Sequence, residues 1–343
     1  MRKISYLLIS LLLLIIFLPS TLAHVPLESG DNVNIENALH IHDPLKSWAI
    51  YDEISRLGEV RYYSCDLKAG DRLKISIFTP EENEFTPDLI IMTPNNVSEP
   101  SLALSFIEMP DGYNLTIIQG ERPTEADYEP FTPSASYRIV DYDKTVNISG
   151  KYYIVVYEQE HKGKFGIAIG YIESFSLTDW LMIPYDVINI HIWEGQHIGF
   201  ILAPLIIIFI IGKIFLFYRH FKQKKSPSRI NTWLGSIAAL LYIGSGGILF
   251  NQMLLALSKT SITPAAGVTL IFIIVPIILG IAIFRITLNE NGELKLKDRF
   301  LFIIYGLLGL FLWAGLIVGP ILIFIASILP NDLKSRKKLT THP

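Results

Sequence analysis

Three histidines near the start of the chain are the residues whose types and spacing best suit chemistry. His40 and His42 are two residues apart, which places two imidazoles on one face of an extended strand. A cut after Ala23 would make His24 the amino terminus. Its amine and imidazole could then bind copper together with His40 or His42. The alternative is that these histidines are solvated surface residues beside a turn at Asp43-Pro44. A copper-binding or redox membrane protein is therefore one possible function.

Carboxylates are the other candidate ligands, because their oxygens suit calcium. Two groups are close in sequence, although neither has EF-hand spacing: Glu81, Glu82, Glu84 and Asp88, and then Glu125, Asp127 and Glu129. The alternative is solvated acidic loops. The sequence contains no Gly-rich phosphate loop, nucleophile elbow, HExxH motif or CxxC pair. It therefore predicts no enzymatic activity and identifies no cofactor.

Cys65 is the only cysteine, so an intramolecular disulfide is excluded. It lies in the alternating run Tyr63, Cys65, Leu67, which predicts a buried core position. Three Asn-X-Ser/Thr sequons are candidate glycosylation sites, at Asn96, Asn114 and Asn147.

The elements that carry these residues begin after a segment typical of secretory signals. Arg2 and Lys3 precede an apolar run from 4 to 18, and small residues follow at 21 and 23, so 1–23 is a predicted signal peptide. Residues 24–173 then show short alternating runs separated by turn residues. Six of these runs predict strands, at 60–67, 72–79, 87–92, 137–142, 151–157 and 165–171. The pattern predicts an extracytoplasmic, jelly-roll-like β-sandwich.

Three motifs in this region suggest a family. A strand is followed by the turn Ala69-Gly70-Asp71, a later one begins Pro87-Asp88-Leu89, and a late one begins Ser149-Gly150-Lys151-Tyr152-Tyr153. In this order they resemble the bacterial pre-peptidase C-terminal type of β-sandwich domain, over roughly 45–171. The resemblance implies a non-catalytic binding or accessory module, here without an attached peptidase. Together with the helices described next, the chain is similar to uncharacterised archaeal membrane proteins.

A juxtamembrane segment, 174–197, is predicted to be an interfacial helix broken at Pro184, with Trp180, Tyr185 and Trp193 at headgroup level. Four apolar stretches then predict a transmembrane bundle over 198–329: 198–218, 230–257, 264–284 and 300–329. Asn251 and Gln252, near the end of the second stretch, could form a polar site or hydrogen-bond between helices.

Basic residues follow the first stretch at Arg219, His220 and Lys222, and the positive-inside rule makes that end cytoplasmic. The domain before it is then exported. Four crossings would place the basic tail, 330–343, outside, although its Lys334 and Arg336 are typical of the inside. The two indications conflict.

Charge is distributed unevenly along the chain, in a way that is typical of membrane proteins. Residues 24–197 carry 28 acidic and 12 basic residues, a net charge of −16, whereas 198–343 carry 4 acidic and 15 basic residues, a net charge of +11. An acidic outer domain disfavours nucleic acid. The sequence predicts a multi-pass protein of the cell membrane whose sandwich binds a surface protein or glycan. An accessory subunit of a transport or export complex, with other membrane subunits as partners, is a further alternative.

Overall fold

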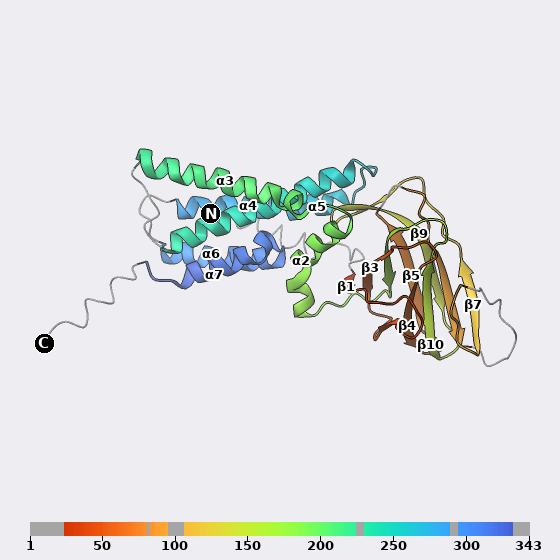
Figure 1. Ribbon diagram of the computed structural model, residues 1–343. Coiled ribbons are helices and arrows are strands. Elements are labelled where there is room, and N and C mark those ends of the chain that lie inside the picture. Colours follow the sequence, from red (N-terminus) through yellow and green to blue (C-terminus); the bar gives the residue numbers. More distant parts are fainter. Residues whose placement is uncertain (1–23, 81–82, 95–105, 224–229, 289–293, 332–343) are drawn as a thin grey trace. The chain divides into compact units, whose positions relative to one another are not determined.

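The computed structural model describes residues 24–80, 83–94, 106–223, 230–288 and 294–331 (Figure 1). Two compact units make up the chain. The sheet unit comprises Met1–Asp127 and Ala135–Ser176, and the helical unit comprises Tyr128–Ser134 and Leu177–Pro343. The predicted signal peptide, the Asn96 sequon and the charged residues of the tail lie outside the described residues.

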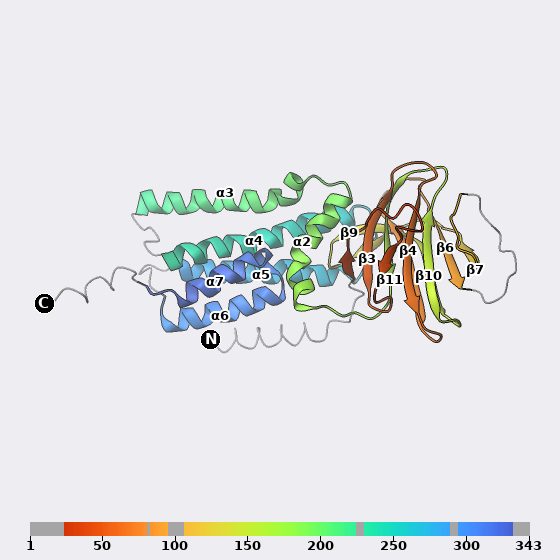
Figure 2. The ribbon, with the colours of Figure 1, turned by 60° about the horizontal axis from the view of Figure 1, so that its bottom comes forward.

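The sheet unit contains two β-sheets, as the sequence predicts (Figure 2). One has the strand order β1-β3-β11-β5-β9-β8 and the other β2-β4-β10-β6-β7. Neighbouring strands are antiparallel except for β1 with β3 and β2 with β4. The strands are β1 Val25–Leu27, β2 Leu39–Ile41, β3 Trp48–Ile54, β4 Val60–Leu67, β5 Arg72–Thr79, β6 Asp88–Pro94, β7 Tyr113–Ile118, β8 Asp127–Glu129, β9 Ser134–Thr145, β10 Gly150–Tyr157 and β11 Gly163–Ile169.

The core between the sheets follows from side-chain alternation along the strands. Cys65 lies in this core and is completely buried, as its place in the sequence predicts. On the neighbouring strand β10, Ile154 and Val156 point into the same core, whereas Val155 belongs to a separate cluster. A two-residue period places alternate side chains on opposite faces, so both faces of the five-stranded sheet are apolar.

A buried polar network also joins β3 to β4. The Tyr63 hydroxyl donates a hydrogen bond of 2.7 Å to Asp52, and the Arg61 guanidinium lies 3.6 Å from the same carboxylate. Arg61 also pairs with Glu59 at 2.8 Å. Removing one partner of such a network would leave a buried charge without compensation, so its members hold one another in place.

Among the described residues of the helical unit, three helices are long and apolar enough to span a membrane: α3 over Ile198–Arg219, α4 and α5. The full helices are α2 Leu177–Trp193, α3 Ile198–Gln223, α4 Ile230–Leu257, α5 Ala266–Thr287, α6 Leu296–Phe311, the 3₁₀ turn η1 Ala314–Leu316 and α7 Val318–Ile328. The juxtamembrane helix differs from its prediction, because α2 continues through Pro184 without a break. Pro184 has no N–H to donate to the Trp180 carbonyl one turn earlier, and that carbonyl instead accepts a hydrogen bond of 3.0 Å from Trp313 Nε1.

The predicted fourth span, 300–329, is not a single helix. It is a hairpin of α6 and α7, whose turn contains three non-glycine residues with positive φ: Trp313, Leu316 and Ile317. The two arms return to the same end, because Arg299 near the start of α6 donates to the Ser327 carbonyl at 2.6 Å. At 1.5 Å per residue, the 16 residues of α6 extend only about 24 Å, less than the roughly 30 Å of a bilayer core.

The hairpin packs on α4 through one aromatic ring. The Tyr242 hydroxyl donates to the Tyr305 carbonyl at 3.0 Å, and Gly309 and Gly319 leave room for the ring between the two arms. A Cβ at Gly309 would lie 1.9 Å from the Tyr242 hydroxyl oxygen, and one at Gly319 would lie 2.7 Å from the ring. Glycine at both positions is therefore required by the close approach of Tyr242.

Candidate functional site

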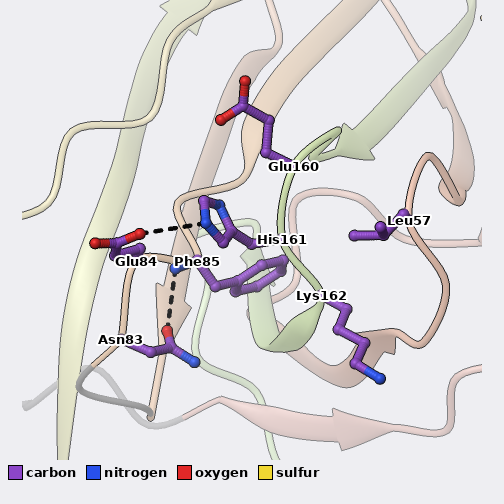
Figure 3. Close-up of a pocket in the computed structure, with 7 residues that line it drawn as sticks. All are labelled: Leu57, Asn83, Glu84, Phe85, Glu160, His161 and Lys162. Atoms are coloured by element: carbon purple, nitrogen blue, oxygen red, sulfur yellow. Dashed lines mark hydrogen bonds and ion pairs between the residues drawn. The ribbon is translucent and has the colours of Figure 1, made fainter.

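An open hollow of about 280 Å³ lies at one end of the sheet unit, where three loops converge (Figure 3). The β3–β4 turn contributes Leu57, the segment before β6 contributes Asn83–Phe85, and the β10–β11 loop contributes Glu160–Lys162. We call these residues the loop hollow. Loops held by a rigid two-sheet scaffold are common sites of binding function.

Phe85 fixes the base of the loop hollow. Its side chain is almost completely buried, and its backbone N–H donates to the Asn83 side chain at 3.1 Å. Gly163, the first residue of β11, lies directly against the phenyl ring, and a Cβ there would come within 2.7 Å of it. A short polar turn and a glycine therefore let the two loops approach each other over an apolar base.

Acidic side chains dominate the rim. The Glu84 carboxylate lies 3.3 Å from His161 Nε2, and Glu84 is the more exposed of the two (Figure 3). On the other side of the ring, Glu158 lies 3.6 Å from His161 Nδ1 and also accepts the His161 backbone N–H. With Glu160, this makes three carboxylates in or beside the loop hollow, compared with one ammonium group, that of Lys162. This excess of negative charge suits a cationic group as ligand.

The structure does not bring the three predicted histidine ligands together. His24 directly precedes β1 of the six-stranded sheet and hydrogen-bonds to Ser47, whereas His40 belongs to β2 of the five-stranded sheet. His40 and His42 do lie close, with ring centroids 4.8 Å apart. Burial, with the nearby cations Lys74 and Arg138, lowers the pKa of His24 to about 4.

Within the described ranges, no group of three or more His, Cys, Asp or Glu residues is arranged to hold a metal ion. The two acidic groups weighed for calcium are thus not gathered into a site there, and Glu81 and Glu82 lie outside the description. Asp127 pairs instead with Arg138 at 3.3 Å.

Two of the predicted glycosylation sites can be placed. Asn114 is exposed on β7, and Asn147 is exposed in the turn before β10. Both side chains are accessible to a modifying enzyme if the sheet unit is exported.

Of the polar pair Asn251 and Gln252 on α4, Gln252 bonds to the connection between α2 and α3. Gln252 and Gln196 exchange two amide hydrogen bonds, at 2.7 and 2.9 Å. Beside them, the Glu194 carboxylate is hydrogen-bonded to His191 Nδ1 at 2.8 Å and accepts a hydrogen bond of 3.4 Å from the Gln196 amide. This cluster ties the α2–α3 junction to α4.

The loop hollow could not be found from the sequence. Its three parts are more than 20 residues apart along the chain, and none carries a recognisable motif. Comparison with known proteins adds no assignment: no protein-family model matches the chain, and no curated protein matches its sequence.

Proposed function

We propose that this chain is a membrane-anchored binding protein, with the sheet unit displayed outside the cell and α3, α4 and α5 crossing the cell membrane. The charge division supports this orientation, since the net charge of −16 precedes α3 and +11 follows its start. Side chains at one end of the helical unit agree: Arg219 donates to the Leu288 carbonyl, and Arg299 lies at the start of α6.

The hairpin supports a topology of three crossings. Asn331, after α7, accepts a hydrogen bond of 2.9 Å from Asn231 at the start of α4, and one of 3.2 Å from the Leu294 backbone before α6. The chain therefore leaves the hairpin at the end that also carries Arg219 and Arg299. On this proposal the basic tail follows into the cytoplasm, which removes the conflict that four crossings create.

The loop hollow is the proposed binding site, and a cationic segment of another surface protein is the proposed ligand. The observation that carries this proposal is that Glu84 and Glu158, from two different loops, lie on either side of His161, while Glu160 lines the same hollow as the apolar ring of Phe85. A lysine or arginine side chain would place its alkyl stem on the apolar base and its charge among the carboxylates.

The test uses the full chain in lipid nanodiscs and short acetylated peptides of four lysines, four arginines or four glutamates. We expect the basic peptides to bind and the acidic one not to. The double variant Glu84→Gln with Glu160→Gln should weaken binding by about tenfold, because the two changes remove the exposed carboxylates of the rim.

The matched control is Glu28→Gln with Glu36→Gln, which removes the same charge from exposed positions outside the loop hollow. It should change affinity less than twofold. Equal losses of peptide affinity in both double variants would show that the overall negative charge of the domain attracts the peptides and that they bind at no specific site. Absence of binding to either basic peptide would also overturn the proposal.

A further inference from the structure

The outer face of the five-stranded sheet carries an apolar cluster of its own. Two segments of the chain pack over part of it, around Ile35 and around Ile107. The Tyr62 hydroxyl accepts the Glu108 backbone N–H at 2.9 Å, which fixes the second segment in place. The buried members are Val60, Tyr62, Ile90, Met92 and Val155.

At the other end of this face, two tyrosines are only half-buried. Tyr153 on β10 and Tyr113 on β7 have ring centroids 5.5 Å apart, with planes at 64°. The Lys151 ammonium lies 5.1 Å from the centre of the Tyr153 ring. Tyrosine combines an apolar ring with a hydroxyl, so such a pair offers both stacking area and hydrogen bonds.

Strand register brings polar groups beside the rings. Asp66 lies opposite Lys151, and Ser64 lies opposite both Tyr153 and His40. His40 Nε2 is 3.7 Å from the Asp66 carboxylate, whose side chain is 69% exposed. Burial, the neighbouring Tyr153 and Asp66 raise the pKa of Tyr113, so its hydroxyl stays a donor. We call Tyr113, Tyr153, Lys151, Asp66 and His40 the tyrosine platform.

The charge of the tyrosine platform narrows the class of ligand. One carboxylate is balanced by one ammonium group, with an imidazole beside them. This balance contrasts with the net charge of −16 over residues 24–197. A strongly charged ligand would therefore gain little electrostatic attraction from the tyrosine platform. The two rings could contact the C–H faces of a ligand, while the flanking polar atoms contact its hydroxyl groups.

We propose that the tyrosine platform binds a neutral polyhydroxyl chain, a glycan without acidic sugars. One sugar ring would stack on Tyr153 and the next on Tyr113, while Asp66 and His40 accept or donate hydrogen bonds to hydroxyl groups. The site lies at the opposite end of β4, β6 and β10 from the loop hollow, and it does not depend on the function proposed for that hollow.

The test measures binding of cellohexaose and maltohexaose by calorimetry, with hexagalacturonate as the charged comparison and the full chain in nanodiscs. At least one neutral hexasaccharide should bind more tightly than the charged one. Tyr153→Ala should weaken binding by about tenfold or more, and Tyr153→Phe by much less, because stacking persists without the hydroxyl.

Tyr51→Ala is the matched control. Tyr51 belongs to a similar T-shaped pair with Phe78, at 6.0 Å, on the six-stranded sheet. Its loss should leave glycan affinity within about twofold. The proposal fails if no neutral hexasaccharide binds, if only hexagalacturonate binds, or if both alanine variants behave alike. It also fails if Tyr153→Ala instead converts a dimer to a monomer, since the platform would then be an interface between copies of this chain.

Discussion

Burial inside the sheet unit changes the chemistry of the single cysteine, Cys65. Alternation placed Cys65 in the core, and burial, with the nearby Asp66 carboxylate, raises the pKa of its thiol to about 12. Because the thiolate is the reactive form, this cysteine should be inert while the sheet unit is folded. The histidine pattern was less informative, since His24 and His40 lie on different sheets. Spacing along the chain cannot show which sheet a strand will join.

His24 leads to a prediction about pH. Its native pKa is about 4, compared with an ordinary 6.5, so between these values the unfolded chain binds a proton that the folded chain does not. Stability must then rise with pH across this window and fall as pH drops from about 6.5 to about 4. We expect a loss of about 2 kcal/mol in the unfolding free energy, and a flatter profile in His24→Gln.

The measurement is urea unfolding followed by trapping of Cys65 with 4,4′-dithiodipyridine, which reacts in acid and reports on the sheet unit alone. The Arg72–Asp143 pair does not contribute in this window, because the Arg72 guanidinium lowers the pKa of Asp143 below its ordinary 3.8 and the pair weakens only in stronger acid. Identical profiles for the wild type and His24→Gln between pH 6.5 and 4.5 would contradict the assignment.

At the level of elements, regular periodicity was a good guide. The runs 60–67 and 72–79 are β4 and β5 with the predicted bounds. Strand β3 was missed, because Asp52 stands at one of its inward positions, where alternation requires an apolar residue. Its carboxylate is buried against Tyr63 and Arg61, partners that a single strand does not reveal. Strand β7 was missed because its sequence lacks a strong alternation of apolar and polar residues.

The hairpin was missed for a different reason. Leu316 and Ile317 adopt positive φ, which β-branched and bulky residues rarely do, so the turn has no recognisable sequence. Gly309, Gly315 and Gly319 leave space for Tyr242 of α4, a residue more than 60 positions earlier, and sequence spacing does not reveal such a contact.

The close packing of Gly309 against Tyr242 predicts the effect of adding one methyl group at position 309. Gly309→Ala should destabilise the helical unit by about 2 kcal/mol, because its Cβ would overlap the Tyr242 hydroxyl, whose hydrogen bond to Tyr305 fixes the ring. The control is Gly267→Ala, also in a helix, where a Cβ meets nothing within 4 Å. Thermal unfolding in detergent measures both. A control that loses as much as Gly309→Ala would show that the packing around Tyr242 is not responsible.

At the level of the whole molecule, composition and charge predicted a β-rich unit followed by an apolar helical unit, and both are present. The number of crossings was not predictable, because an apolar stretch of 30 residues has the same hydropathy whether it forms one tilted helix or two short arms. The bonds of Asn331 to Asn231 and Leu294, together with that of Arg299 to the Ser327 carbonyl, show two short arms.

Three crossings predict opposite locations for the sheet unit and the tail. Cys65 is buried, so a single added cysteine reports its own position. In sealed cells, a membrane-impermeant maleimide should label Asp111→Cys, in an exposed loop, and should label Thr340→Cys only after permeabilisation. Labelling of both in sealed cells would favour four crossings. Labelling of Thr340→Cys alone would retain three crossings and reverse the proposed orientation.

The hairpin contributes to the packing of the helical unit but not to the proposed membrane topology. A hairpin that enters and leaves the bundle at the same end does not change whether the number of membrane crossings is odd or even, whatever its depth. A chain ending after Thr287 would therefore keep the same sidedness as the full chain, while Tyr242 would lose the two arms that enclose it. On the proposed topology of three crossings, the hairpin would pack against the bundle without changing which compartment either end of the chain occupies.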